Sequence, residues 1–312
     1  MKAIRISAGK PELIDTAKPE GNDVLVRVAS SSICGSDLHL INLGWAEGSI
    51  MGHEFAGYTP DGTAVAVEPV VGCHHCDYCD EGRYPLCLHG ATYLGIDHPG
   101  GMAEYVAVPE HLVYALPSGL DISSACLVEP LAVAVHGLNQ ARVTPSDRLL
   151  ILGAGAIGLA TAAVLQARGM PFDIKARHSA QQTAARALGG NTDTVDGYDV
   201  VIDAVGNSSS VAEAIAHVKP RGRIGMVGSF WQPVEVDISF CAKEIEMISA
   251  AGYKCVSPGR TFEEAAQLLH ANPHIADTLI SHRFPLDGAV EAFNTAADRA
   301  SGAIKVCFDI AS

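Results

Sequence analysis

The sequence predicts an α/β protein that combines a doubly wound parallel sheet with a second, mostly β domain. Residues 1–115 contain short β-like runs, such as "DVLVRVASSSI" and "AEYVAVP", between turns of Gly, Pro and Asp. From residue 148 onward, apolar runs alternate with segments of helical length. This rhythm is typical of a parallel sheet covered by helices on both faces. With 312 residues, the chain is long enough for two domains and a sizeable buried core.

The elements of the parallel sheet follow from the spacing of the apolar residues. We expect strands at residues 148–154, 172–176, 198–206 and 222–228, with helices at 157–169, 180–190 and 210–219 between them. A helix at 262–272 and two late strands should return to the first domain. One domain is therefore expected to comprise residues 1–138 and 253–312, and the other residues 139–252.

Composition and charge argue against several classes of protein. Hydrophobic residues make up 48% of the chain and charged residues 18%, which is an ordinary globular mixture. The formal net charge of −14 opposes non-specific binding to nucleic acid. The start, "MKAIRISAGK", lacks the apolar core of a signal peptide, and no apolar run reaches membrane-spanning length. We therefore expect a cytoplasmic protein whose partners are small molecules, not nucleic acids or membranes.

The segment "GCHHCDYCDEGRYPLC" carries four cysteines with the spacing C-x2-C-x2-C-x7-C, namely Cys73, Cys76, Cys79 and Cys87. Four thiolates this close in sequence can close a tetrahedral zinc shell and leave no open position, which indicates a structural site. Disulfide pairing is the alternative, but cysteines in a chain without a leader favour metal ligation. An iron–sulfur centre is also formally possible.

A glycine-rich turn, "GAGAIG", follows an apolar strand and opens a helix. Gly153 would permit the tight turn, Gly155 would let the backbone approach a pyrophosphate, and Gly158 would pack the helix against the strand. Backbone N–H groups of the turn, which also includes Ala156 and Ile157, would face the phosphates at the helix start. The turn predicts that this domain binds a dinucleotide.

The strand after this turn, in "FDIKARH", ends in a basic pair where a carboxylate usually holds a ribose hydroxyl. Ala176 removes the repulsion that a carboxylate would exert on a 2′-phosphate. Arg177 offers a permanently charged fork that suits phosphate oxygens, and His178 offers a second donor. We therefore predict a preference for NADP(H) over NAD(H). The alternative is that Arg177 only lies on a solvated loop.

Three further stretches, "SICGSDLH", "IMGHEFAG" and "LVEPLAVAVHG", contain residue types that bind zinc. Cys34, His53, Glu54 and Glu129 would supply one thiolate, one imidazole and two carboxylates. Taken singly, each has an ordinary explanation, because a buried Cys is usually part of the core and a His-Glu pair usually lies on the surface.

Together, these stretches resemble the zinc-dependent medium-chain dehydrogenase/reductase family over essentially the whole chain. The matching elements are CGSDLH, GHE, the four-cysteine lobe, GGMAEY, EPLAVAVHG and GAGAIG, in the order of the family. Within the family, the chain resembles the polyol and threonine dehydrogenase branch, in which the third position that faces the zinc is the glutamate of an EPL segment, here Glu129. The resemblance implies a GroES-like catalytic zinc domain at 1–138 and 253–312, a Rossmann domain at 139–252 and two zinc ions per chain. It also implies a homo-oligomer, either a dimer or a tetramer.

The resemblance further implies roles for single residues. Cys34 and His53 would bind the catalytic zinc, and Glu54 and Glu129 would do so directly or through water.

Proton transfer and cofactor contacts are implied in the same way. Ser36 would take the proton of the substrate hydroxyl and pass it through the cofactor ribose to His39. Lys305 matches a position at which the family often has a basic residue that reaches the cofactor.

The expected function is that of a zinc-dependent alcohol dehydrogenase or ketone reductase, which transfers a hydride between NADP(H) and a secondary alcohol or polyol. One alternative is a zinc-free type of enone or quinone reductase on the same scaffold, which would not need the set of zinc ligands. Another is a nucleotide-binding zinc protein without catalytic activity.

The chain departs from the family pattern in three places. Only 18 residues separate Cys34 from His53, and the stretch after Gly57 shrinks to a tight turn at Pro60-Asp61-Gly62. Only "NTDTVDG", residues 191–197, separates the helix at 180–190 from the next strand. A full third strand would need a return connection of a dozen or more residues. We therefore predict that residues 191–197 form no full parallel edge strand.

Overall fold

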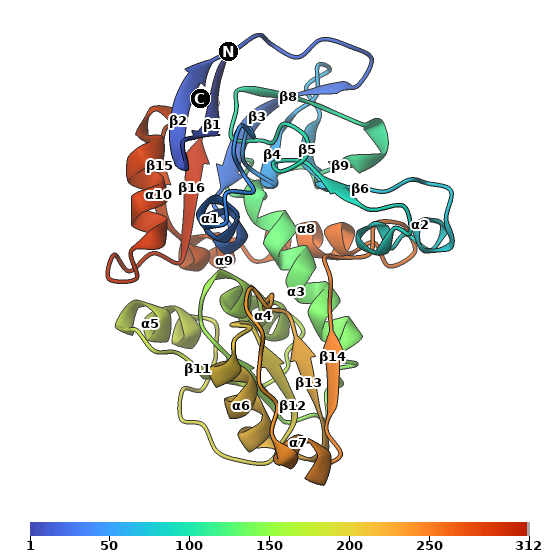
Figure 1. Cartoon of the computed structure of the whole chain (residues 1–312), viewed down its shortest axis with the longest axis vertical. Helices are drawn as coiled ribbons and strands as arrows, with labels where there is room; N and C mark the ends of the chain where they lie inside the picture. Colours follow the sequence, from blue (N-terminus) through green and yellow to red (C-terminus); the bar gives the residue numbers. More distant parts are fainter. Residues whose placement is uncertain (311–312) are drawn as a thin grey trace. The chain divides into compact units, whose positions relative to one another are not determined.

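The computed structural model describes residues 1–310 (Figure 1). The chain divides into two compact units. One consists of Met1–Glu129 together with the chain from Lys254 onward, and the other is Pro130–Tyr253. Among the described residues, no helix is both long and apolar enough to cross a membrane.

The first unit is built around a seven-stranded sheet in the order β15-β16-β3-β4-β5-β9, in which β8 also pairs with β3. Its strands are β3 (Val24–Ser32), β4 (Glu54–Tyr58), β5 (Ala64–Val67), β8 (Tyr105–Val108), β9 (Val113–Ala115), β15 (Ile280–Phe284) and β16 (Lys305–Asp309). Strand β16 lies near the end of the chain but pairs antiparallel with β3. This pairing places Cys307 opposite Ser32 and brings the late segment next to the start of the chain.

Two small antiparallel sheets and several helices complete this unit. The sheets are β1 (Lys2–Ser7) with β2 (Lys10–Asp15), and β6 (Val70–Val71) with β7 (Thr92–Tyr93). The α-helices are α1 (Gly35–Asn42), α2 (Asp77–Asp80), α8 (Thr261–Ala271), α9 (His274–Leu279) and α10 (Ala289–Ala297). Short 3-10 helices lie at Tyr84–Leu86, Glu110–Leu112, Ala125–Leu127 and Leu286–Gly288.

The connection between β4 and β5 is the tight turn that the sequence predicts. The N–H of Thr59 donates to the carbonyl of Thr63 at 3.0 Å, and the N–H of Gly62 donates to the carbonyl of Thr59 at 2.9 Å. Asp61 accepts hydrogen bonds from the Thr59 hydroxyl and the Thr63 N–H, which favours the turn. Gly62 has a φ of +88°, a conformation that glycine adopts without steric cost.

The second unit contains a parallel five-stranded sheet in the order β11-β10-β12-β13-β14. The strands are β10 (Leu149–Leu152), β11 (Asp173–Lys175), β12 (Tyr198–Asp203), β13 (Val218–Met226) and β14 (Glu246–Ser249). The helices are α3 (Val128–Gln140), which starts just before the unit, α4 (Ala156–Ala167), α5 (Ser179–Ala187), α6 (Ser208–His217) and α7 (Ile238–Ala242). The alternation of parallel strands and helices confirms the predicted fold class.

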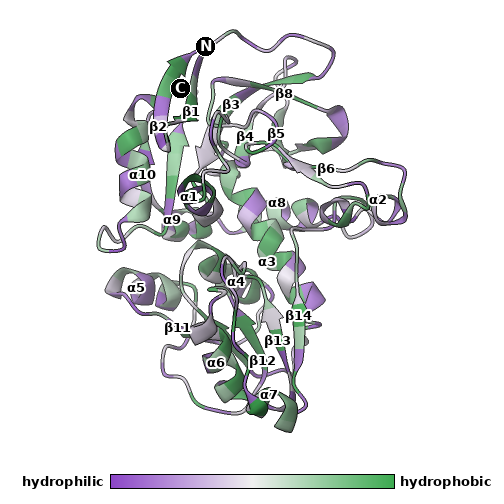
Figure 2. Cartoon of the chain, in the orientation of Figure 1, coloured by the Kyte–Doolittle hydropathy of each residue, from purple (hydrophilic) through white to green (hydrophobic). Residues whose placement is uncertain are grey.

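Burial follows the apolar pattern of this unit. All four residues of β10 are buried, and so is the stretch from Gly158 to Leu165 in α4, which is rich in the good helix formers Ala and Leu. Figure 2 shows β12 in hydrophobic colours and α5 mainly in hydrophilic ones. Helix α5 accordingly buries only Ala184 and Ala185.

The edge of the parallel sheet confirms the prediction for residues 191–197. Strand β11 is the outermost strand, and within residues 1–310 only Asn191 continues the sheet beyond it, as an isolated bridge to Asp173. The N–H of Asn191 donates to the Phe172 carbonyl at 3.1 Å, and the N–H of Ile174 donates to the Asn191 carbonyl at 2.8 Å. The chain then enters β12 at Tyr198, whose hydroxyl donates to the Asp173 carboxylate at 2.5 Å. A single residue thus covers the edge where a strand would otherwise pair.

Candidate active site and cofactor site

Cys34, His53 and Glu54 come together in the first unit. One ligand atom from each side chain lies within 4.8 Å of the others. Cys34 caps the start of α1 directly after β3, whereas Glu54 is the first residue of β4 and lies opposite Ser32 of β3. The pairing of β3 with β4 therefore brings Cys34 to the neighbouring residues His53 and Glu54, from which 18 residues of the chain separate it.

Asp37, to which no sequence motif assigned a role, contacts both Cys34 and His53 of this cluster. The carboxylate is fully buried, and its Oδ2 accepts the backbone N–H of Cys34 at 2.9 Å. Its Oδ1 lies 3.2 Å from Nδ1 of His53, although the geometry of that contact falls short of a hydrogen bond. The signal for Asp37 was present in the sequence, because an acid three residues after an N-cap is the pattern of a capping box.

The carboxylate of Glu54 is held by a buried lysine. Both of its oxygens lie 2.7 Å from Nζ of Lys305, and the Ser32 hydroxyl donates to Oε2. Glu54 is fully buried and Lys305 is 1% exposed, so water cannot compensate either charge. Burial alone would lower the pKa of Lys305, but the Glu54 carboxylate outweighs this effect and raises the pKa. The contact therefore has the geometry of a buried ion pair.

The cluster fits a zinc ion. Zinc–sulfur bonds of about 2.3 Å and zinc–nitrogen or zinc–oxygen bonds of about 2.0–2.2 Å put any two ligand atoms within roughly 4.5 Å of each other. The ligand atoms of Cys34, His53 and Glu54 all lie within 4.8 Å of one another, so only a small inward movement is needed to reach zinc-bond distances. Nδ1 of His53, which is buried and lacks a hydrogen bond, faces Asp37, as is usual for a histidine that binds a metal through its other nitrogen. Three ligands from the protein would leave one position open.

The remaining predicted residues of this site lie in nearby elements of the chain. Glu129 is buried in the first turn of α3, and its carboxylate does not belong to the cluster of ligand atoms around Cys34. Ser36 is half-buried and His39 is exposed, and both lie on α1 three residues apart, which places them on one face of the helix. Their roles stay predictions.

The four cysteines of the lobe also come together. The sulfur atoms of Cys73, Cys76, Cys79 and Cys87 lie within 4.8 Å of one another, and the last three side chains are buried. Backbone N–H groups of Leu88 and Cys79 lower the pKa of Cys76 to about 6, whereas burial raises the pKa of Cys79. A low pKa favours the thiolate, which is the form that binds a metal. Four sulfur ligands fill a tetrahedral shell, so this cluster fits a closed structural site.

The glycine turn has the geometry that close approach to a dinucleotide requires. Gly153 has a φ of +91°, and its N–H donates to the carbonyl of Lys175 at 3.2 Å, which ties the turn to the end of β11. A Cβ on Gly158 would lie 1.8 Å from the carbonyl oxygen of Gly153, so only glycine fits there. A Cβ on Gly155 would meet no protein atom within 4 Å. That free space at the start of α4 is where a pyrophosphate would bind.

The two basic residues after β11, Arg177 and His178, differ from their neighbour Lys175 in the contacts that they make. The ammonium of Lys175 pairs with Glu213 of α6 and is neutralised. Arg177 is exposed, and among residues 1–310 its guanidinium has no hydrogen bond or ion pair. His178 is exposed at the N-cap of α5, where its backbone N–H donates to Oε1 of Gln181 at 3.4 Å. The charge of Arg177 is thus available to a ligand.

Two family models match the chain. The alcohol dehydrogenase GroES-like domain matches residues 20–118, and the glucose dehydrogenase C-terminus matches residues 122–310. The chain belongs to the zinc-dependent medium-chain dehydrogenase family. This confirms the predicted resemblance, and it makes the protein an oxidoreductase of the alcohol and polyol dehydrogenase type.

Two relatives of this dehydrogenase carry the names of a sugar and of a sugar acid. D-xylulose reductase A of Aspergillus oryzae is 32% identical over 277 residues, which cover 75% of this chain and 76% of the relative. L-idonate 5-dehydrogenase of Vitis vinifera is 28% identical and covers 92% and 88% of the two chains.

Solved structures of the family show the same fold. Galactitol-1-phosphate dehydrogenase from Escherichia coli superposes with a TM-score of 0.90 at 26% identity, over 99% of this chain and 100% of the other. A putative zinc-binding dehydrogenase from Sinorhizobium meliloti 1021, bound to NADP, gives a TM-score of 0.86 at 27% identity over 99% and 98%.

Replacement of Lys305 by Met should destabilise the folded dehydrogenase and lower its catalytic activity. The carboxylate of Glu54 would stay buried without its partner, and breaking a buried ion pair costs about 3–5 kcal/mol. Denaturant unfolding and kcat/KM measure both effects. Lys2→Met, which removes an exposed lysine paired with Asp287, is the control and should change neither quantity noticeably. Equal stability of the two variants would contradict the assigned role of Lys305.

Proposed function

We propose that the protein oxidises a secondary alcohol group of a polyol or sugar acid with NADP+, or reduces the matching ketone with NADPH. The observation that carries the proposal is the cluster of Cys34, His53 and Glu54, whose three ligand atoms would leave one position of a zinc ion open. We further propose that the unit with this cluster is the catalytic domain, and that the unit with the glycine turn binds the dinucleotide. Two zinc ions per chain and a homo-oligomer belong to the same proposal.

The catalytic zinc would be held by Cys34, His53 and Glu54, with Glu129 as a further ligand directly or through water. A bound zinc ion supplies a Lewis acid that stabilises negative charge on the substrate oxygen. The Cys34 thiolate lies at the N-terminus of α1, where the helix dipole favours negative charge. Asp37 orients the His53 ring, and Lys305 balances the charge of Glu54.

The hydroxyl proton of the substrate would leave along α1. Ser36, which is half-buried next to Cys34, would accept this proton while its own hydroxyl proton passes on toward His39, and His39 would exchange a proton with solvent one helical turn later. Partial desolvation of the ring and the nearby Arg299 lower the pKa of His39, which favours the neutral imidazole that can accept a proton. The nicotinamide of the cofactor supplies the hydride acceptor. A positioned relay of this kind avoids leaving a proton in a site that excludes water.

Activity with a panel of substrates tests the proposed function. The panel contains polyols, sugar acids, simple secondary alcohols and the matching ketones, each followed at the nicotinamide absorbance with NADP(H) and with NAD(H). We expect turnover of at least one polyol or sugar acid, with a higher kcat/KM for NADP(H). Turnover of enones or quinones alone would support the zinc-free reductase instead. Absence of turnover with every compound would favour a nucleotide-binding protein without activity.

Replacement of Arg177 by Ala should weaken the binding of NADP(H) and leave the binding of NAD(H) nearly unchanged. A hydrogen bond to a charged group contributes roughly 1.5–3 kcal/mol, which corresponds to a tenfold to hundredfold rise in the KM for NADP(H). Arg221→Ala, which removes an exposed arginine from the same unit, is the matched control and should change neither KM. A wild-type enzyme that prefers NAD(H) would contradict the interpretation of Arg177.

A further inference from the structure

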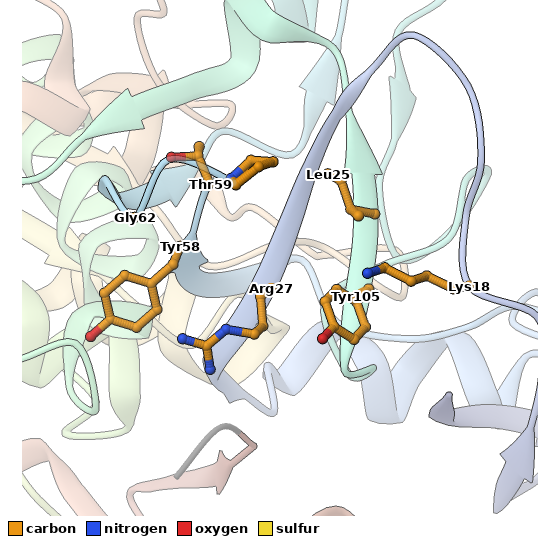
Figure 3. Close-up of a pocket in the computed structure, with 8 residues that line it drawn as sticks. Lys18, Leu25, Arg27, Tyr58, Thr59, Gly62 and Tyr105 are labelled. Carbon is orange, nitrogen blue, oxygen red and sulfur yellow. The ribbon is translucent and has the colours of Figure 1, made fainter.

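A row of aromatic and basic side chains crosses three neighbouring strands of the first unit. Arg27 of β3 lies directly opposite Tyr58 of β4 on one side and Tyr105 of β8 on the other. Residues in direct cross-strand register project from the same face of a sheet. Figure 3 shows the guanidinium of Arg27 between the two tyrosine rings. The row is separate from the candidate zinc ligands, because β4 starts with Glu54 and reaches Tyr58 only at its other end.

The two cations of this region are fixed by tyrosine rings. The guanidinium carbon of Arg27 lies 5.0 Å from the ring centre of Tyr58, and Nζ of Lys18 lies 3.8 Å from the ring centre of Tyr105. Contacts of this kind hold the cations in place without neutralising them. Among residues 1–310, neither Lys18 nor Arg27 has a carboxylate within ion-pair distance. Two free positive charges therefore lie together on a chain with a net charge of −14.

These side chains line a hollow of about 460 Å³. Leu25, Thr59, Pro60 and Gly62 form the rest of its wall, so the short turn between β4 and β5 closes one side. Pockets for small organic ligands have volumes of about 300–1,000 Å³. The hollow is therefore large enough for a small organic molecule, and its volume is larger than that of an inorganic anion.

We propose that this hollow binds a small organic phosphate, such as a sugar phosphate. The planar guanidinium of Arg27 and the ammonium of Lys18 would bind the phosphoryl oxygens, which is the chemistry that these groups favour. The tyrosine rings hold both cations, and Leu25 and Pro60 offer apolar contact to the carbon skeleton. The site is independent of the proposed alcohol oxidation, because it uses none of the residues of the zinc or dinucleotide sites.

Calorimetric titration of the zinc-loaded protein tests the proposal. The probes are glucose 6-phosphate, inorganic phosphate and glucose, at constant ionic strength. We expect glucose 6-phosphate to bind more tightly than inorganic phosphate, and Arg27→Gln or Lys18→Gln to weaken it by tenfold or more. Lys10→Gln removes an exposed charge of the same unit outside the hollow, and it should leave the Kd unchanged.

Two further variants separate this site from the others. Arg177→Ala should not affect the binding of glucose 6-phosphate, because a loss there would assign the phosphate to the dinucleotide site and overturn the proposal. Binding that persists in Arg27→Gln would overturn it as well. Sedimentation velocity of Arg27→Gln detects a third outcome: if this variant dissociates an oligomer, the row contacts a second copy of the chain and the proposal is wrong. A catalytically inactive protein would leave all these expectations unchanged.

Discussion

Replacement of Cys34 by Ser is expected to lower kcat/KM by about a thousandfold or more while the protein stays folded. Cys34 contributes the only sulfur to the cluster with His53 and Glu54, and a metal Lewis acid supplies several kcal/mol of transition-state stabilisation. A loss of about 4 kcal/mol corresponds to a factor of roughly a thousand in rate. Steady-state kinetics, circular dichroism and zinc content of the same preparation measure the three effects.

The matched control for Cys34→Ser is Cys241→Ser. Cys241 is exposed on α7 and belongs to neither cysteine cluster, so its loss should change neither activity nor zinc content. We expect Cys34→Ser to hold one zinc ion fewer than the control. Retention of wild-type activity in Cys34→Ser would show that catalysis does not use this cluster.

Replacement of Cys79 by Ser is expected to destabilise the protein strongly, with a loss above about 3 kcal/mol. The lobe around Cys79 has little core of its own, and binding of metal to a closed site is coupled to folding. Its contact with the rest of the first unit includes a 2.8 Å hydrogen bond from the N–H of Cys255 to the carbonyl of Gly82. Loss of the metal should loosen this contact as well.

Thermal unfolding and zinc analysis of Cys79→Ser check this expectation. At roughly 2–4 °C per kcal/mol, the midpoint should fall by about 6 °C or more, and the zinc content should fall by one. Cys241→Ser serves again as the control. The result that contradicts a structural metal is a Cys79→Ser protein with unchanged stability and an unchanged zinc content.

The parts of the site that the sequence could predict are those with local signatures. The glycine turn and the four-cysteine spacing each depend on one short segment, and both have the expected geometry. The set of Cys34, His53 and Glu54 required two segments to meet, and the antiparallel pairing of β3 with β4 brings them together.

The parts that the sequence could not predict depend on distant contacts. Lys305 and Glu54 are 251 residues apart, and their ion pair exists only because β16 pairs with β3. In the structure the ammonium of Lys305 binds Glu54, and the contact with the cofactor that the family resemblance implies stays a prediction. No local pattern reports which side chains meet across a sheet.

One feature of the fold could be predicted from the length of a connection, namely the seven residues 191–197 before β12. Seven residues are too few for an edge strand and its return, and the structure has only the bridge at Asn191. Short elements without a strong apolar period, such as β14, α7 and α9, were not predicted from the sequence. Their positions depend on packing against the rest of each unit, which a single sequence does not show.

The central claim is that turnover depends on zinc at the cluster of Cys34, His53 and Glu54. Its most direct test is to measure zinc content and NADP+-dependent turnover on the same samples while a chelator withdraws the metal in steps. We expect two zinc ions per chain at the start and loss of activity with the first ion removed, because the site with the open position releases its metal first. Added zinc should restore activity in step with the metal bound. Full activity in protein that retains no zinc would contradict the claim.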